Sequence, residues 1–183
     1  MSIITKILAG IAILIAIPFI MATFITRDYH ITREITIQQP KEIVFDYLKY
    51  LKNQDNYSVW VRMDPTMAKT FSGTDGLPGF TYAWEGNSKA GKGNQKIVSI
   101  KEGDSIDIAV NFIKPFEATA HTPFTTTAIT AGETRVKWEA IGKSNYPMNF
   151  MNLFADKLMG GDMMKSLEML KSILENPTHT LNQ

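Results

Sequence analysis

The first feature of the chain is an apolar run long enough to cross a membrane. Residues 7–26 read ILAGIAILIAIPFIMATFIT and carry no charged side chain. A helix of that length rises about 30 Å, which matches the hydrocarbon core of a bilayer. A cleaved signal peptide has a shorter apolar region and a small-x-small cleavage site, and residues 21–25 (MATFI) offer no convincing one. The pattern favours an uncleaved, single-pass N-terminal anchor over a signal peptide.

Beyond that run, the chain predicts a strand followed by a helix. Apolar and polar residues alternate from Tyr29 to Gln38, as in a strand with one apolar face. Pro40 suits the start of a helix, and apolar residues then recur at helical spacing as far as Leu51. Residues 53–57 predict a turn or a short second helix.

The middle of the chain predicts a series of strands joined by short turns rich in Gly and Asp. They cover residues 67–71, 80–84, 94–100, 106–112, 118–130 and 136–140. Short connections favour an antiparallel meander, because parallel strands need a long crossover between them.

The chain ends in a predicted helix with apolar residues at helical spacing from Phe150 to Leu174. Gly160-Gly161 interrupts this pattern and is expected to kink the helix. The order of elements predicts an α+β fold with a curved antiparallel sheet of about six to seven strands around the long C-terminal helix. The expected units are an anchor at residues 1–26, a folded domain at 27–176 and a polar tail at 177–183.

Composition narrows the chemistry further. The 183 residues include no Cys, which excludes disulfides, thiolate metal sites and a thiol nucleophile. The net charge of +1 gives no reason to expect a nucleic-acid partner. The three His residues, at 30, 121 and 179, are too widely spaced for a metal-ligand pattern. No phosphate-binding loop or nucleophile elbow is present, so we expect neither a cofactor nor a metal.

The order of elements and several local motifs resemble the SRPBCC or START-like superfamily, whose helix-grip domains are also described as birch-pollen-allergen-like. The local sequence is similar to its bacterial polyketide cyclase/dehydrase-like branch. The likeness covers about residues 28–175 and is carried by Ile35-Thr36-Ile37-Gln38-Gln39-Pro40 with Val44-Phe45-Asp46-Tyr47-Leu48, Trp60, Asp64-Pro65, Tyr82-Ala83-Trp84-Glu85-Gly86-Asn87, Phe112-Ile113-Lys114-Pro115-Phe116, Thr134-Arg135-Val136-Lys137-Trp138 and Met151-Asn152-Leu153-Phe154. The resemblance implies a helix-grip fold, with membrane-anchored versions recurring in that branch. It does not fix an activity, because the superfamily includes lipid carriers, hormone receptors, cyclases and co-chaperones.

The resemblance also implies a cavity between the sheet and the terminal helix, and the apolar pattern suggests which residues line it. The candidates are Arg33, Phe80, Tyr82, Trp84, Ile108, Val110, Phe112, His121, Val136, Trp138, Phe150, Phe154, Leu158 and Met163. The alternative for the apolar members is ordinary hydrophobic core. Arg33 either lies in solvent at a strand end or holds an anionic ligand group, and His121 either lies at the surface or acts as a base. Asp64 and Glu85 could serve as acid and base, but both fall at apparent strand ends.

Three functions remain open at this stage. We favour a membrane-anchored domain, placed in a bacterial inner membrane by residues 7–26, that binds a lipid or other small hydrophobic ligand. A cyclase or dehydratase is the enzymatic alternative, although no acid/base pair stands out. The third is a non-catalytic module for protein interaction, with its protein partners unidentified. The sequence leaves the side of the membrane on which the domain lies open.

Overall fold

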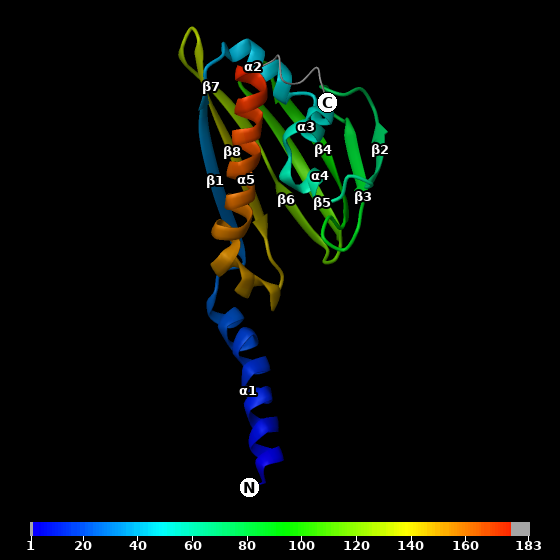
Figure 1. Cartoon of the computed structure of the whole chain (residues 1–183), viewed down its shortest axis with the longest axis vertical. Coiled ribbons are helices and arrows are strands. Elements are labelled where there is room, and N and C mark those ends of the chain that lie inside the picture. Colours follow the sequence, from blue (N-terminus) through cyan, green and yellow to red (C-terminus); the bar gives the residue numbers. More distant parts are fainter. Residues whose placement is uncertain (1, 177–183) are drawn as a thin grey trace.

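The protein consists of an antiparallel sheet curved around one long helix, with a second long helix extending away from the sheet (Figure 1). The computed structural model describes residues 2–176, and the expected polar tail lies outside them. In chain order the elements are α1 (Ile3–Phe24), β1 (Asp28–Ile37), α2 (Lys41–Leu48), η1 (Leu51–Asn53), α3 (Gln54–Tyr57), α4 (Val59–Arg62), β2 (Ala68–Ser72), β3 (Thr81–Glu85), β4 (Lys92–Lys101), β5 (Ser105–Lys114), β6 (Ala118–His121), β7 (Phe124–Thr130), β8 (Glu133–Lys143), η2 (Met148–Met151) and α5 (Asn152–Glu175).

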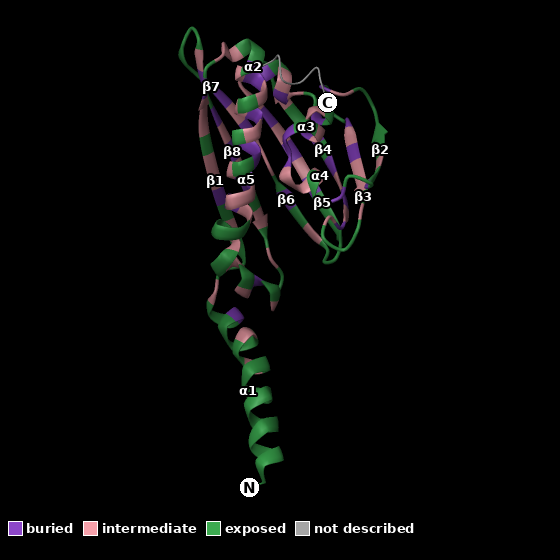
Figure 2. Cartoon of the chain, in the orientation of Figure 1, coloured by how far each residue is buried: buried purple, intermediate pink, exposed green. Residues whose placement is uncertain are grey.

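All eight strands belong to one antiparallel sheet, which runs β1-β8-β6-β5-β4-β3-β2. Strand β7 lies between β5 and β8, as β6 does. Helix α5 packs along β1 and covers the concave face, and the buried residues lie mainly on the strands and on α5 (Figure 2). The core there is formed by the alternating apolar positions of the strands and by the inner face of α5, in which Met163, Leu167 and Leu170 are fully buried. The α+β class predicted from the sequence is confirmed.

The predicted strand at 118–130 is interrupted, which is a correction to the sequence interpretation. Pro123 has no N–H to give to a ladder, and the strand divides there into β6 and β7. The break is held in place on both sides. The amide of Thr122 donates to the carbonyl of Ile108 at 2.8 Å, and the amide of Glu139 donates to the carbonyl of Pro123 at 3.0 Å.

Helix α1 is long and apolar enough to cross a membrane. Specific hydrogen bonds attach its C-terminal end to the rest of the domain. Ala22 is its single buried residue. The side-chain amide of Asn149, in η2, donates to the carbonyls of Ala22 and Ile25 at 2.7 and 2.8 Å. Asn152 donates in the same way to the next two carbonyls along the chain, at 3.0 Å each. Asn149 thus satisfies two carbonyls that the end of the helix would otherwise leave open, and Asn152 binds the segment that follows the helix.

Candidate functional site: an apolar cavity under helix α5

A cavity of about 350 Å³ lies between the concave face of the sheet and the first half of α5. Its wall is mainly aromatic and aliphatic, and all three Trp residues of the chain belong to it. The lining residues are Tyr29, Gln54, Ser58, Trp60, Val61, Met67, Tyr82, Trp84, Gln95, Val110, Phe112, Ala120, Thr122, Trp138, Ala140, Leu158, Met159, Asp162 and Met163. Within them, Trp60 packs edge-to-face against Trp138, with ring centroids 5.6 Å apart.

One part of the wall is polar and almost completely buried. The side-chain amide of Gln95 donates to the side-chain carbonyl of Gln54 at 2.9 Å. Among residues 2–176 the remaining amide atoms of this pair, Gln54 Nε2 and Gln95 Oε1, have no hydrogen-bond partner. The pair therefore leaves a donor group and an acceptor in a mainly apolar wall, which also contains Ser58, Thr122, Asp162 and the unpartnered Nε1 of Trp138.

Two tyrosines of the lining remain neutral over the ordinary pH range. Burial raises the pKa of Tyr29, and burial together with the hydrogen bond to Asp55 raises the pKa of Tyr82. The Tyr82 hydroxyl donates to Asp55 Oδ1 at 2.6 Å, and Lys69 pairs with Asp55 Oδ2 at 2.8 Å. Because the phenol already donates to a carboxylate, it is held as a fixed structural donor and is not poised to act as a base.

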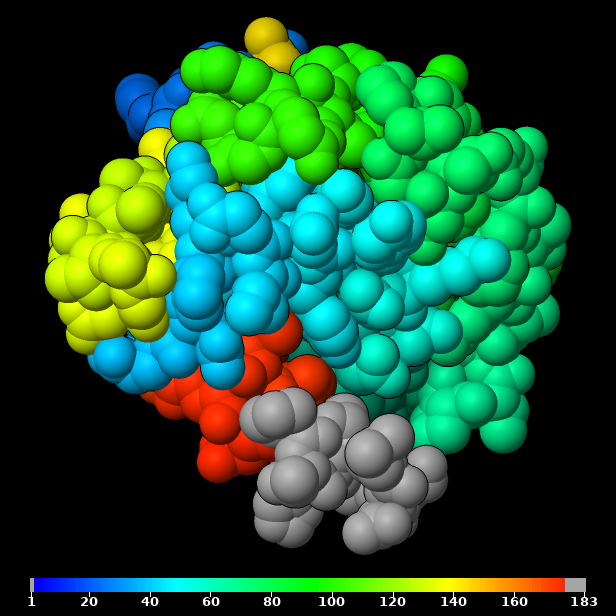
Figure 3. Space-filling view, turned by 90° about the horizontal axis from the view of Figure 1, so that it is seen from above, coloured from blue at the N-terminus to red at the C-terminus, as the bar shows by residue number. Residues whose placement is uncertain are grey.

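The mouth of the cavity lies at the end of the domain that faces α1. Leu158 and Phe112 line the cavity yet have exposed side chains, so the opening lies between the first half of α5 and the last residues of β5. Figure 1 shows both of these segments on the side of the domain towards α1. The opposite end is covered by the blue-to-cyan residues of α2 to α4, which fill the centre of the view from above (Figure 3).

Half of the candidates proposed from the sequence line this cavity. They are Tyr82, Trp84, Val110, Phe112, Trp138, Leu158 and Met163. Phe80, Ile108 and Val136 lie instead in the hydrophobic core, fully buried. Phe150 and Phe154 fall in η2 and in the exposed first turn of α5, outside the cavity wall.

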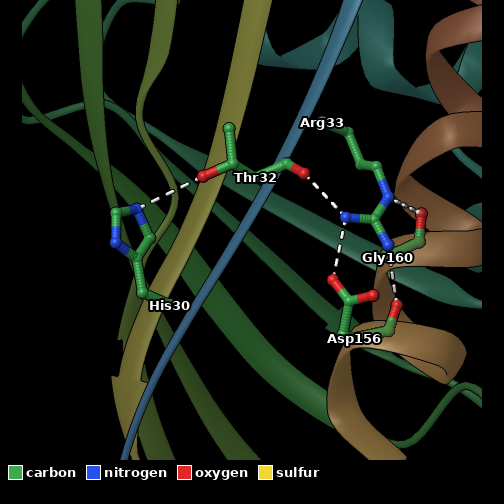
Figure 4. Close-up of polar contacts among 5 residues, drawn as sticks. All are labelled: His30, Thr32, Arg33, Asp156 and Gly160. Atoms are coloured by element: carbon green, nitrogen blue, oxygen red, sulfur yellow. Dashed lines mark hydrogen bonds and ion pairs between the residues drawn. The ribbon is translucent and has the colours of Figure 1, made fainter.

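Arg33 neither lies free in solvent nor reaches into the cavity. Its guanidinium clamps α5 to β1, donating to the carbonyl of Gly160 at 3.1 Å and to the carbonyl of Asp156 at 2.9 Å (Figure 4). It also pairs with the Asp156 carboxylate at 2.9 Å and donates to the carbonyl of Thr32 at 2.7 Å. Four of the five N–H groups of the guanidinium thus donate to the protein itself, which makes Arg33 a structural contact between β1 and α5 rather than a site for an anionic ligand.

His121 lies on the outer face of the sheet. Its Nδ1 lies 3.1 Å from Asp107 Oδ1, and both side chains are partly exposed. It borders a second hollow, whose lining shares Tyr29, Val110 and Ala120 with the cavity under α5. The inward alternation of β6 places Ala120 in the cavity, and His121 therefore points to the other side.

Twelve lining residues were not selected from the sequence. Some of them could have been identified from the strand pattern, and others could not. Tyr29 and Ala140 sit on the predicted inward faces of their strands, so the period-two pattern contained them. Gln54, Ser58, Gln95, Thr122 and Asp162 are polar, and no sequence pattern distinguishes them from surface residues. The remaining members are Trp60, Val61, Met67, Ala120 and Met159.

Asp64 and Glu85, considered from the sequence as an acid and a base, serve the loops around β3. The Thr66 hydroxyl and the amides of Asn87 and Thr66 donate to Asp64 at 2.7, 2.7 and 3.0 Å, and they hold the pKa of this carboxyl below its usual range. A hydrogen bond from Lys92 at 2.7 Å likewise lowers the pKa of Glu85. Neither carboxylate borders the cavity.

We expect Asp64→Asn to make the stability of the protein less dependent on acid pH. The folded state lowers the pKa of Asp64, so its contribution is complete above about pH 5 and is lost as the pH falls through the folded pKa. The variant should melt several degrees lower near neutral pH and show a shallower decline between about pH 5 and pH 3. Thermal unfolding of the full chain across this range measures both effects. Asp28→Asn, on an exposed strand end, is the control, and an equal slope in both variants would contradict the assignment.

Among residues 2–176, no group of three or more His, Asp or Glu side chains is arranged to hold a metal ion.

The chain matches no protein-family model and no curated protein. Its structure is similar to norcoclaurine synthase from Thalictrum flavum in complex with dopamine and hydroxybenzaldehyde, with a TM-score of 0.63 at 7% identity over 85% of this chain and 91% of that one.

Two other solved structures share the architecture. A Chromobacterium violaceum protein has a TM-score of 0.58 at 12% identity, over 80% of this chain and 96% of that one. Ara h 8.0201 has a TM-score of 0.51 at 15% identity, over 78% of this chain and 98% of that one. At these identities the likeness concerns the fold, and it confirms the helix-grip fold expected from the sequence.

Proposed function

We propose that this protein is a membrane-anchored binding domain for a small hydrophobic molecule, such as a lipid, which it holds in the cavity under α5. Residues 1–26 would provide the anchor and residues 27–176 the binding domain. The observation that carries the proposal is an apolar cavity of about 350 Å³ whose exposed lining residues, Leu158 and Phe112, belong to segments on the side of the domain towards the apolar helix α1. That volume is typical of ligand pockets, which are mostly apolar with a few placed polar groups.

The wall chemistry favours a ligand with a long apolar part and one neutral polar group. Burying about 300 Å² of apolar surface would contribute about 7.5 kcal/mol before the cost of ordering the ligand. Micromolar binding needs about 8.2 kcal/mol net, so polar contacts with the wall must add to the apolar burial. The free donor and acceptor of the Gln54–Gln95 pair suit a hydroxyl or carbonyl. The lining contains no Lys or Arg among the described residues, so a carboxylate would enter without a counter-charge.

Binding is favoured over cyclase-type catalysis by the titratable groups of the wall. They are Tyr29, Tyr82 and Asp162. The two phenols are held neutral, and Asp162 lies 3.4 Å from Lys165 on the same helix. General acid–base catalysis needs a group whose pKa is near the working pH and which reaches the reacting atoms, and the two phenols do not meet this condition.

The test uses the three Trp residues as reporters, because Trp60, Trp84 and Trp138 all line the cavity. The full chain, in nanodiscs of unmodified phosphatidylcholine, is titrated with dibromododecanol, a neutral fatty alcohol whose bromines quench Trp on contact. We expect a saturable loss of most of the Trp emission. The corresponding brominated acid should bind at least several-fold more weakly.

The matched variants separate cavity binding from partitioning into the bilayer. Ala140→Phe places a large side chain in the buried wall of the cavity, whereas Ala128→Phe adds the same side chain at an exposed position on β7. We expect Ala140→Phe to abolish saturable quenching and Ala128→Phe to leave it unchanged. Equal quenching in the two variants, or quenching that never saturates, would refute the proposed binding function.

A further inference from the structure

A second uncharged segment of the chain lies beside the end of α1. Residues 144–155, SNYPMNFMNLFA, contain no charged side chain, although Lys143 precedes them and Asp156 follows them. They form the turn after β8, the helix η2 and the first turn of α5. Figure 1 shows this segment at the end of the domain nearest α1.

The segment contacts α1 about one and a half turns before the C-terminal end of that helix. The ring of Tyr146 packs edge-to-face on the ring of Phe19, with centroids 6.4 Å apart. Phe19 precedes the last helical residue, Phe24, by about 8 Å along the helix axis. The Asn149 bonds to Ala22 and Ile25 hold the same stretch of η2 against the last turn of α1.

These contacts fix the depth of the segment. To cross a hydrocarbon core of about 30 Å, an α-helix needs about 20 apolar residues. Helix α1 has 22 residues from Ile3 to Phe24, so it spans the core only if almost its whole length is immersed. Phe19 then lies inside the hydrocarbon boundary, and its contact with the Tyr146 ring brings residues 144–155 to the edge of the hydrocarbon.

The outward side chains of the segment match that position. Tyr146, Met148, Met151, Leu153 and Phe154 are 39 to 53% exposed. Exposed apolar groups of this size are costly in water when they gather in one place, and Tyr is a common residue at the bilayer interface. An uncharged surface also avoids the cost of bringing a charge to the edge of the hydrocarbon.

We propose that residues 144–155 form a second membrane-contacting element, which lies in the interfacial layer of the bilayer and sets the domain on its surface. The inference rests on the proposed function in one respect, because it takes α1 as the membrane anchor. The occupant of this apolar surface is the phospholipid bilayer itself. Phe154 and Leu158 are one helical turn apart on α5, and Leu158 lines the cavity mouth. The proposed membrane-contacting segment therefore ends one helical turn before a residue of the cavity wall.

The test measures the depth of single spin labels in the full chain. The protein contains no Cys, so each variant carries one label at a known position. Met151→Cys and Phe154→Cys test the proposal. Ile13→Cys, in the middle of α1, reports whether the anchor is inserted, and Ile129→Cys, an exposed apolar position on β7, reports water exposure. The samples are phosphatidylcholine nanodiscs, and the readout is the ratio of collisions with oxygen to collisions with a water-soluble nickel complex.

We expect the ratio to be highest at position 13 and lowest at position 129. At positions 151 and 154 it should be several-fold higher than at position 129. If positions 151 and 154 resemble position 129 while position 13 is immersed, the interfacial element is refuted and the anchor stands. If position 13 is also water-exposed, the anchor fails and the inference fails with it. Trp quenching by dibromododecanol in the same samples shows separately whether the cavity binds its ligand.

Discussion

Replacing Arg33 with methionine is expected to lower the free energy of unfolding by about 3 kcal/mol, because it removes three charge-assisted hydrogen bonds between β1 and α5. The side chain is 22% exposed and donates to two α5 carbonyls and to the Asp156 carboxylate. Methionine retains most of the length of the side chain but none of its donors. Arg33→Lys should recover only part of the loss, because an ammonium cannot reproduce the planar fork that reaches Gly160 and Asp156 together.

Two adjacent glycines provide the matched test of this clamp. A Cβ at Gly160 would collide with the Arg33 guanidinium, whereas a Cβ at Gly161 would meet nothing within 4 Å. Both residues lie within α5, where alanine is otherwise preferred over glycine by about 1 kcal/mol. We therefore expect Gly160→Ala to destabilise the protein and Gly161→Ala to stabilise it, although the two substitutions are chemically identical.

The measurement combines thermal unfolding of the full chain with amide hydrogen exchange in α5. Loss of the clamp should increase exchange mainly in the first half of α5, which holds Leu158 and Met159 at the cavity. Stabilisation by both glycine variants, or a uniform change of exchange over the whole helix, would contradict the proposed role of Arg33.

The Arg33 clamp shows why much of the fold could be predicted from the sequence while this contact could not. The strand at 28–37 and the helix at 152–175 follow from alternation and from helical spacing, which are local properties. The role of Arg33 depends on which turn of α5 packs against β1. Arg33 and Gly160 are more than a hundred residues apart in the chain, so no local pattern predicts their contact. The sequence offered Gly160-Gly161 as an irregularity of the helix, and the structure shows that Gly160 permits the close approach of Arg33.

The candidate site divides in the same way. Period-two alternation identifies the inward face of a strand, but a single inward face contributes both core and cavity. On β5, Val110 and Phe112 line the cavity, whereas Ile108 on the same face is fully buried in the core. The difference depends on how far α5 and α2 to α4 extend over the sheet, and that is a tertiary property. The buried Gln54–Gln95 pair could not be predicted either, because glutamine is usually a surface residue in helices and strands alike.

Replacing Asn149 with leucine should separate α1 from the domain without unfolding the domain. The substitution removes both donors and leaves the carbonyls of Ala22 and Ile25 beside an apolar side chain, at a position only 1% exposed. Two unpaired carbonyls should cost about 3 kcal/mol, which is about a 100-fold shift from the docked to the undocked junction. In the proposed arrangement, with α1 in a bilayer, the cost is greater because little water is present to replace the lost donors.

The readout is the distance distribution between spin labels at Ile13→Cys and Ile129→Cys, one in α1 and the other on β7. In the native junction, Asn149 and Asn152 donate to four carbonyls, those of Ala22, Ile25, Thr26 and Arg27, so the two labels should give a single narrow distance. Asn149→Leu should broaden this distribution and leave the melting temperature of the domain almost unchanged. Asn111→Ala, which removes an exposed side-chain hydrogen bond to Asn94 on the sheet, should leave it narrow. If the distribution is already broad in the native protein, α1 is a flexible tether, and the orientation of the cavity mouth towards the bilayer would have to be set by the 144–155 segment alone.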